Sequence, residues 1–135
     1  AIAAGIRIHD DRVVVKVFNC ARSDKNDIIS EVFKSKAVII GSPTINRGIL
    51  SAVAAIMEEI KGLAFKNKKA AAFSSYGWSG ESVKIITERL KEAGFAVLND
   101  GIRELWTPDK AGRENCINFG KNFASLLGTD FKSVP

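Results

Sequence analysis

The stretch Val38-Ile39-Ile40-Gly41-Ser42-Pro43-Thr44-Ile45-Asn46 decides the fold class, because a short apolar run ends abruptly in a polar loop. The run is continuous and β-branched, which is typical of a strand covered on both faces. Residues 49–61 follow with apolar positions at helical spacing, and Gly62 is the expected stop. A strand, a polar loop and a helix in this order form the basic unit of a parallel α/β sheet.

The same unit recurs along the whole chain. The expected strands are residues 13–18, 37–40, 70–73 and a fourth region at 95–98 and 102–105, broken by a turn at Asn99-Asp100-Gly101. Helices alternate with them: the last turns of one at residues 1–6, closed near Gly5, and others capped by Ser23, by Ser79 and by Thr107-Pro108-Asp109. This alternation predicts one open, three-layer α/β domain over residues 1–128, with a flexible tail at residues 129–135.

Length and charge narrow the functional classes. A chain of 135 residues suits one domain. No apolar run approaches the ~20 residues that cross a membrane, and no signal peptide opens the chain, so we expect a cytoplasmic protein without membrane contact. The net charge is +5, but the positive residues are scattered and the densest group is only Lys66, Lys68 and Lys69. We therefore expect no nucleic-acid partner.

Two loops at expected strand ends are candidate ligand sites, because ligands bind outside the carboxyl ends of parallel strands. The first loop contains Ser42, Pro43, Thr44, Ile45 and Asn46. It offers backbone amides, a hydroxyl and a side-chain amide that could recognise a flat heterocycle. A polar turn leading into a helix cap is the alternative interpretation.

The second loop contains Ser75, Tyr76, Gly77, Trp78, Ser79 and Gly80. Two large aromatic residues beside glycines are hard to explain as core. Trp78 offers a π-face, and glycine lets the backbone approach a ligand closely. The alternative is a tryptophan folded back onto the domain.

Two other protein classes, serine hydrolases and phosphoryl-receiver domains, do not fit these residues. A serine hydrolase needs G-x-S-x-G followed later by a histidine, whereas Gly77-Trp78-Ser79-Gly80 misplaces the second glycine and His9 lies in the opening segment. A phosphoryl-receiver domain needs acidic residues at strand ends, whereas Asp10 and Asp11 precede the first expected strand. His9 also lacks partners at metal-ligand spacing, so we expect no metal site.

With these two loops, and with Phe18-Asn19-Cys20-Ala21-Arg22-Ser23, the sequence resembles the flavodoxin-like domain of flavodiiron proteins, the A-type flavoproteins that include flavorubredoxin. The resemblance extends from about Ala1 to Leu127. It implies a three-layer flavodoxin-like fold and an FMN cofactor. The family's loops matching residues 42–46 and 75–80 hold the flavin ring between aromatic residues.

The resemblance also implies a function in electron transfer. Full-length relatives reduce NO or O2 at a diiron domain, which FMN supplies with electrons from a rubredoxin-type donor, usually across a head-to-tail dimer. The expected partners are thus a diiron domain, a rubredoxin-type donor and a second copy of the chain. The diiron ligands are absent from this sequence, so we expect no reductase site and assign no catalytic residue.

Two departures from the family pattern matter. The family's first strand and its phosphate-binding loop would precede Ala1, so we expect FMN binding by this chain to be weakened or absent. We also expect residues 13–18 to lack their neighbour in the 2-1-3-4-5 strand order. Arg47 stands where relatives commonly have a small polar residue, and our hypothesis is that its charge favours the reduced, anionic flavin. The alternative interpretation is an exposed arginine that contributes little. The alternatives are a cofactor-free, self-associating fragment, or a free-standing flavodoxin or quinone-reductase-like FMN protein.

Overall fold

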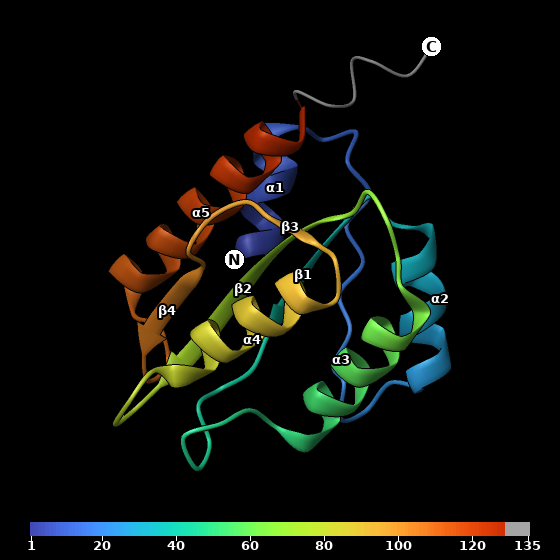
Figure 1. Ribbon diagram of the computed structural model, residues 1–135. Coiled ribbons are helices and arrows are strands. Elements are labelled where there is room, and N and C mark those ends of the chain that lie inside the picture. The colour runs from blue at the N-terminus through green and yellow to red at the C-terminus, as the bar shows by residue number, and fades with distance from the viewer. Residues whose placement is uncertain (129–135) are drawn as a thin grey trace. The chain divides into compact units, whose positions relative to one another are not determined.

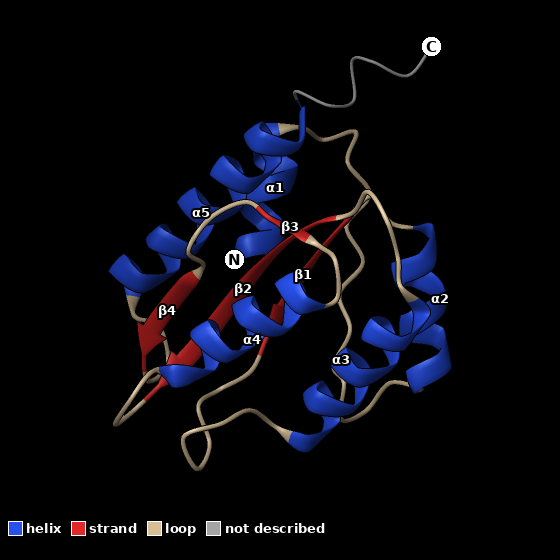
Figure 2. Cartoon of the chain, viewed as in Figure 1, coloured by secondary structure: helices blue, strands red, loops and turns tan. Residues whose placement is uncertain are grey.

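The computed structural model describes residues 1–128 (Figures 1 and 2), so the predicted tail at residues 129–135 lies outside the described residues. Helices and strands follow one another in the order α1, α2, β1, α3, β2, α4, β3, β4, α5. The chain divides into two compact units. One is Phe18–Trp106, and the other combines Ala1–Val17 with the described residues from Thr107 onward.

The unit Phe18–Trp106 contains a parallel sheet, which confirms the predicted α/β class. Its strands are β1 (Ala37–Gly41), β2 (Lys69–Tyr76), β3 (Ala96–Val97) and β4 (Ile102–Leu105). β1 pairs with one edge of β2, while β3 and β4 pair with successive parts of the other edge. The predicted break between β3 and β4 is confirmed, because Asn99 Oδ1 accepts a hydrogen bond from the Gly101 amide and Gly101 has a φ of +80°.

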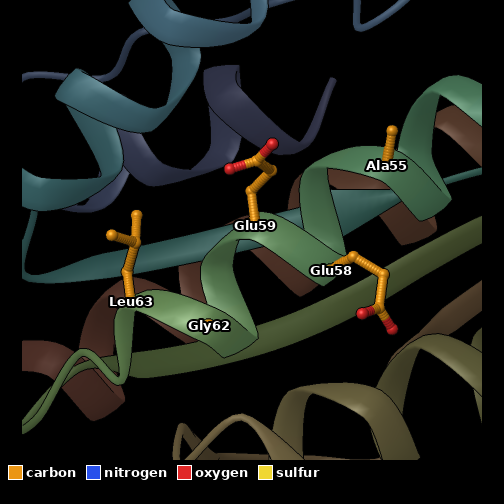
Figure 3. Close-up of a pocket in the computed structure, with 5 residues that line it drawn as sticks. All are labelled: Ala55, Glu58, Glu59, Gly62 and Leu63. Atoms are coloured by element: carbon orange, nitrogen blue, oxygen red, sulfur yellow. The ribbon is translucent and has the colours of Figure 1, made fainter.

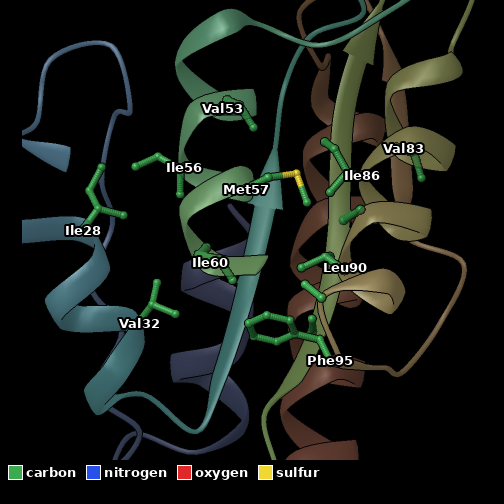
Figure 4. Packing of buried hydrophobic residues seen from close by; sticks show 13 residues of the cluster. Ile28, Val32, Val53, Ile56, Met57, Ile60, Val83, Ile86, Leu90 and Phe95 are labelled. Atoms are coloured by element: carbon green, nitrogen blue, oxygen red, sulfur yellow. The ribbon is translucent and has the colours of Figure 1, made fainter. Parts of the chain in front are cut away.

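The core of this unit lies between β2 and its helices α2 (Lys25–Lys34), α3 (Ser51–Leu63) and α4 (Glu81–Glu92). Figure 4 shows the side chains from these helices meeting one another. Alanines fill the strand side, which lets the large aliphatic side chains of the helices pack closely. The buried cluster consists of Ile28, Val32, Val53, Ile56, Met57, Ile60, Ala70, Ala72, Val83, Ile86, Leu90, Ala93 and Phe95.

The other unit is built on two helices, α1 (Ile2–His9) and α5 (Lys110–Gly128), that touch through their backbones. A Cβ atom added to Gly5 would lie 2.0 Å from the Ile117 carbonyl oxygen, and one added to Gly120 would lie 2.1 Å from the Ile2 carbonyl oxygen. Gly5 does not close its helix as expected. It lies inside α1, where the missing side chain permits contact with α5.

The predicted strand at residues 13–18 is wrong, because this segment is irregular (Figure 2). Val14 and Val17 are 81% and 75% exposed. A β-branched run becomes a strand only when a neighbouring strand supplies its ladder, and none of the described strands pairs with this segment. The Val15 carbonyl instead accepts a hydrogen bond of 3.0 Å from the Arg7 guanidinium.

Several predicted boundaries also shift. β2 does not break at Ser74 but continues through Ser75 and Tyr76. Asp24 rather than Ser23 caps α2, accepting hydrogen bonds from the Asn26 and Asp27 amides. Gly62 does not stop α3, which ends at Leu63 with Ala64 as its C-cap. Gly80 rather than Ser79 is the N-cap of α4, which has no side-chain cap. At the start of α5, Asp109 rather than Thr107 accepts a hydrogen bond from the Gly112 amide.

Candidate functional site

The candidate site lies where β1, β2 and β4 reach their carboxyl ends. The first loop, residues 42–48, leaves β1, and the second loop, residues 75–80, includes the last two residues of β2 and the turn into α4. Their backbones join: the Ser42 amide donates to the Phe73 carbonyl at 3.3 Å and the Thr44 amide to the Ser75 carbonyl at 3.0 Å. The structure therefore brings the two predicted loops together at the carboxyl ends of the strands, which we call the carboxyl edge of the sheet.

The first loop turns its hydroxyl groups inward. Ser42 is 3% exposed, and its Oγ accepts a hydrogen bond of 2.9 Å from the Leu50 amide at the start of α3. Thr44 Oγ1 donates to Ser82 Oγ at 2.9 Å. Ser42 thus ties the loop to the residue that precedes α3, while α3 itself begins without a side-chain cap. These two hydroxyls fix the path of the loop, and the Ser42 side chain is closed to solvent.

The tip of the first loop is a tight turn. Ile45 and Gly48 exchange two backbone hydrogen bonds of 3.1 and 2.8 Å, and the two residues between them, Asn46 and Arg47, have φ values of 51° and 60°. Two central residues with positive φ are the mark of a type I′ turn. Asparagine tolerates this conformation well, whereas for arginine it is uncommon. Ile45 is 44% exposed, so the turn presents an apolar side chain to solvent.

The second loop displays an aromatic side chain. Trp78 is 95% exposed, which excludes the alternative of a tryptophan folded back onto the domain. Tyr76 is half-buried, and the Arg103 guanidinium lies 5.5 Å from the centre of its ring. The two aromatic residues of the loop thus have different roles, since Tyr76 is packed and Trp78 is open.

Trp106 is a third aromatic residue at this edge, and the sequence motifs did not single it out. It follows β4 directly, its amide donates to the Tyr76 carbonyl at 2.7 Å, and its φ is 54°. A Cβ atom added to Gly77 would lie 2.6 Å from the Trp106 ring, so the ring rests on the second loop. The available signal was its position, since Trp106 follows a strand in the same way as the two loops do.

Glu81, the first residue of α4, provides negative charge beside both loops. A hydrogen bond from the Ser79 hydroxyl holds the pKa of Glu81 below its usual value, and its own backbone N–H and the charge of Arg47 act in the same direction. Its Oε2 atom is buried and has no hydrogen-bond partner within the described residues. The sequence motifs did not assign Glu81 to the site.

A hollow along α3 lies away from these loops. It is lined by Ala55, Glu58, Glu59, Gly62 and Leu63 (Figure 3). Glu59 is already engaged there in an ion pair of 2.7 Å with Lys25. The loops, by contrast, lie near the opposite end of α3, where Leu50 precedes its first turn. The hollow therefore provides no argument for a ligand.

Comparison with known proteins identifies the class. The family model for flavodoxin matches residues 1–120, so this chain belongs to the flavodoxin family. A flavodoxin from the domain Archaea superimposes with a TM-score of 0.82 at 28% identity, covering 94% of this chain and 85% of the other. The flavodoxin-like fold predicted from the sequence is therefore confirmed. No described helix combines the length and apolarity that crossing a membrane requires.

Within that class the chain is homologous to flavorubredoxin and the flavodiiron proteins. It is 45% identical over 124 residues to an anaerobic nitric oxide reductase flavorubredoxin of Escherichia coli, covering 92% of this chain and 26% of the relative. Rubredoxin oxygen:oxidoreductase from Desulfovibrio gigas superimposes with a TM-score of 0.86 at 35% identity, covering 95% of this chain and 32% of the other. The chain thus spans about a quarter to a third of the length of these relatives.

Proposed function

We propose that this chain is the FMN-binding, electron-transfer domain of a flavodiiron nitric oxide or oxygen reductase. The observation that supports it most is Trp78, which is 95% exposed in a loop joined to the first loop at the carboxyl edge of the sheet. Flavodoxins bind FMN at this edge of the fold. The names of the homologues, a nitric oxide reductase flavorubredoxin and a rubredoxin oxygen:oxidoreductase, agree with the proposal.

The residues at this edge fit a flavin ring. The ring has two apolar faces and a polar rim with an imide N–H. Trp78 and Ile45 offer exposed apolar surface, and aromatic stacking suits a flat heterocycle. The buried, unpartnered Oε2 of Glu81 is an acceptor that a ligand N–H would satisfy. Residues 42–46 and 75–80 are thus the proposed ring-binding segments, with Glu81 and Trp106 added.

In this function the protein binds and orients the cofactor. When bound, FMN supplies the electron transfer, and the protein determines its position and electrostatic surroundings. Trp78 would cover a ring face and exclude water from it. Arg47, in the turn beside Glu81, would place a positive charge near the ring and favour its reduced, anionic form.

The proposed partners follow from the homologues. We propose that electrons arrive from a rubredoxin-type donor and leave to a diiron domain, with a second copy of the chain completing the path. To test the donor, a reduced rubredoxin is mixed with the FMN-loaded chain, and the absorbance of oxidised flavin is monitored. We expect this absorbance to fall as the flavin is reduced. The proposed donor is wrong if that absorbance does not fall.

Titration of the 135-residue chain with FMN tests the proposed function. We expect quenching of flavin fluorescence and a shift of the flavin visible bands as the ring enters the site. Riboflavin, which lacks the phosphate, is the matched control ligand and should bind through the same loops. The proposal is overturned if both flavins keep the fluorescence and spectrum of free flavin at saturating protein.

A further inference from the structure

A cluster of hydroxyl groups lies beneath the two loops, formed by Ser42, Thr44, Ser74 and Ser82. Three of these side chains are almost inaccessible, with exposed fractions of 3% for Ser42, 6% for Ser74 and 0% for Ser82. They come from three elements: the first loop, β2 and the start of α4. Ser82 is the member that touches all the others.

Ser82 uses its whole hydrogen-bonding capacity within the cluster. Its Oγ donates to the Ser42 carbonyl at 3.0 Å, accepts from Thr44 Oγ1 at 2.9 Å and is hydrogen-bonded to Ser74 Oγ. A hydroxyl has one proton to donate and two lone pairs, so three partners are the most that Ser82 Oγ can hold. The Ser74 hydroxyl also lies 2.9 Å from the Ser75 carbonyl, so the protons of Ser74 and Ser82 are shared among three contacts. The Ser82 amide also donates to Thr44 Oγ1 at 3.3 Å.

The position of the cluster distinguishes it from ordinary core packing. Ser82, Ile86 and Leu90 are spaced four residues apart on α4, and each is 0% exposed. This buried stripe is therefore apolar at its two later positions and polar only where it meets the loops. Hydrogen bonds are directional, whereas apolar contacts are not, so the polar end of the stripe fixes the separation and register of its partners.

We propose that Ser82 is a positioning residue that holds the first loop against β2 and the second loop, and thereby sets the spacing of the flavin site. This proposal rests on the proposed function. Loss of the Ser82 hydroxyl would remove one hydrogen-bond partner each from the Ser42 carbonyl, Thr44 Oγ1 and Ser74 Oγ. Thr44 Oγ1 would keep only the Ser82 amide, and Ser74 Oγ would keep the Ser75 carbonyl. Polar groups that lose a buried partner favour rearrangement, and the first loop would be displaced because Thr44 and the Ser42 carbonyl belong to it.

The first test is FMN affinity in the Ser82→Ala chain. We expect the dissociation constant to rise about tenfold, because the ring-binding surfaces lose their fixed spacing. Ile86→Val is the matched control: it trims a buried side chain one turn further along the same stripe, and it should leave the affinity unchanged. The Ser74→Ala chain removes one partner and should show a smaller loss, and the double variant should lose less than the product of the two single losses.

The second test needs no flavin. Hydrogen exchange of the Thr44 amide, which donates to Ser75 across the two loops, should accelerate about tenfold or more in Ser82→Ala. The Leu98 amide, which donates to Ala70 at the other end of the sheet, is the internal control and should not change. If Ser82→Ala does not fold, the same comparison is made with Ser74→Ala.

The outcomes separate the two proposals. If the unmodified chain binds FMN and Ser82→Ala binds it equally well, the positioning role is overturned. If the unmodified chain binds no flavin, the proposed function fails, and exchange at Thr44 alone decides whether Ser82 holds the loops. Unchanged exchange there overturns that role too, whereas faster exchange at Thr44 with unchanged exchange at Leu98 supports it.

Discussion

Trp78 is the residue whose surroundings are hardest to explain without a ligand. Tryptophan is highly buried on average, yet this side chain is 95% exposed. Burying a large aromatic side chain against a partner recovers free energy that exposure forfeits. A ring placed against Trp78 would do so, and the sequence indicated this by setting the residue between glycines.

Replacing Trp78 by alanine should weaken FMN binding and leave the fold intact. We expect a loss of about 1 kcal/mol or more of binding free energy from the missing stacking contact, roughly a fivefold or larger rise in the dissociation constant. Phe33→Ala removes an exposed aromatic residue from the far end of α2 and is the control with unchanged affinity. An unaltered dissociation constant for Trp78→Ala would assign this side chain another role.

Ser79→Ala should make Glu81 a weaker acid. The Ser79 hydroxyl is the largest cause of the lowered pKa of Glu81, so its removal should move that pKa upward, toward the usual glutamate value. An NMR titration of the Glu81 side-chain carboxyl measures the change, and Ser125→Ala, an exposed serine on α5, is the control. A Glu81 pKa that does not move would rule out the Ser79 hydrogen bond as its cause.

The same pair predicts a pH dependence of stability. Because the folded-state pKa is lowered, the ionised Glu81 stabilises the fold above its usual pKa, and this contribution is lost as the pH falls through the lowered value. The unmodified chain should therefore exceed Ser79→Ala in stability near neutral pH, and the difference should shrink in acid. Urea unfolding followed by circular dichroism at several pH values checks this.

At the scale of elements, local sequence patterns predicted helices and core strands but not their partners. The apolar periodicity of α3 and α4 placed both helices correctly, and Asn99-Asp100-Gly101 marked the break between β3 and β4. Residues 13–18 have a β propensity as high as that of the observed strands, but none of the described strands pairs with them. Such a partner is supplied only by tertiary structure. Trp106 escapes such patterns because its ring contacts Gly77 in a distant segment, and Glu81 does so because the charge of Arg47 reaches it from the other loop.

Two glycines in helices should respond in opposite directions to alanine. Gly120→Ala would place a Cβ atom 2.1 Å from the Ile2 carbonyl oxygen and force α1 and α5 apart, so we expect a loss of about 1–3 kcal/mol in unfolding free energy. A Cβ atom added to Gly62 on α3 would meet nothing within 4 Å beyond its chain neighbours and the helix's own backbone, so Gly62→Ala should gain about 0.5 kcal/mol through helix propensity.

Thermal unfolding followed by circular dichroism compares the two glycine variants directly. Both substitutions add the same methyl group to a helix, so both change helix propensity alike. If one variant is stabilised and the other destabilised, the difference comes from the contact between α1 and α5. If Gly120→Ala were as stable as Gly62→Ala, the close backbone contact between the two helices would not exist in solution.

For the whole molecule, the order of elements was the most informative part of the sequence. Alternating strands and helices predicted a parallel α/β sheet, and the two loops indicated the family to which the chain belongs. The hydroxyl cluster could not be predicted in that way. Ser42, Ser74 and Ser82 lie in separate segments of the chain, and only the folded sheet shows that their side chains meet.

The placement of Trp78 and Trp106 has a practical consequence for spectroscopy. The sequence contains two tryptophans, and they lie in the second loop and directly after β4, at the carboxyl edge of the sheet. Tryptophan fluorescence, excited selectively at the long-wavelength end of protein absorption, therefore originates at this edge and not in the core. Such emission is a built-in optical reporter of the loops: it should change when a ligand arrives there, even while the circular dichroism of the helices stays constant.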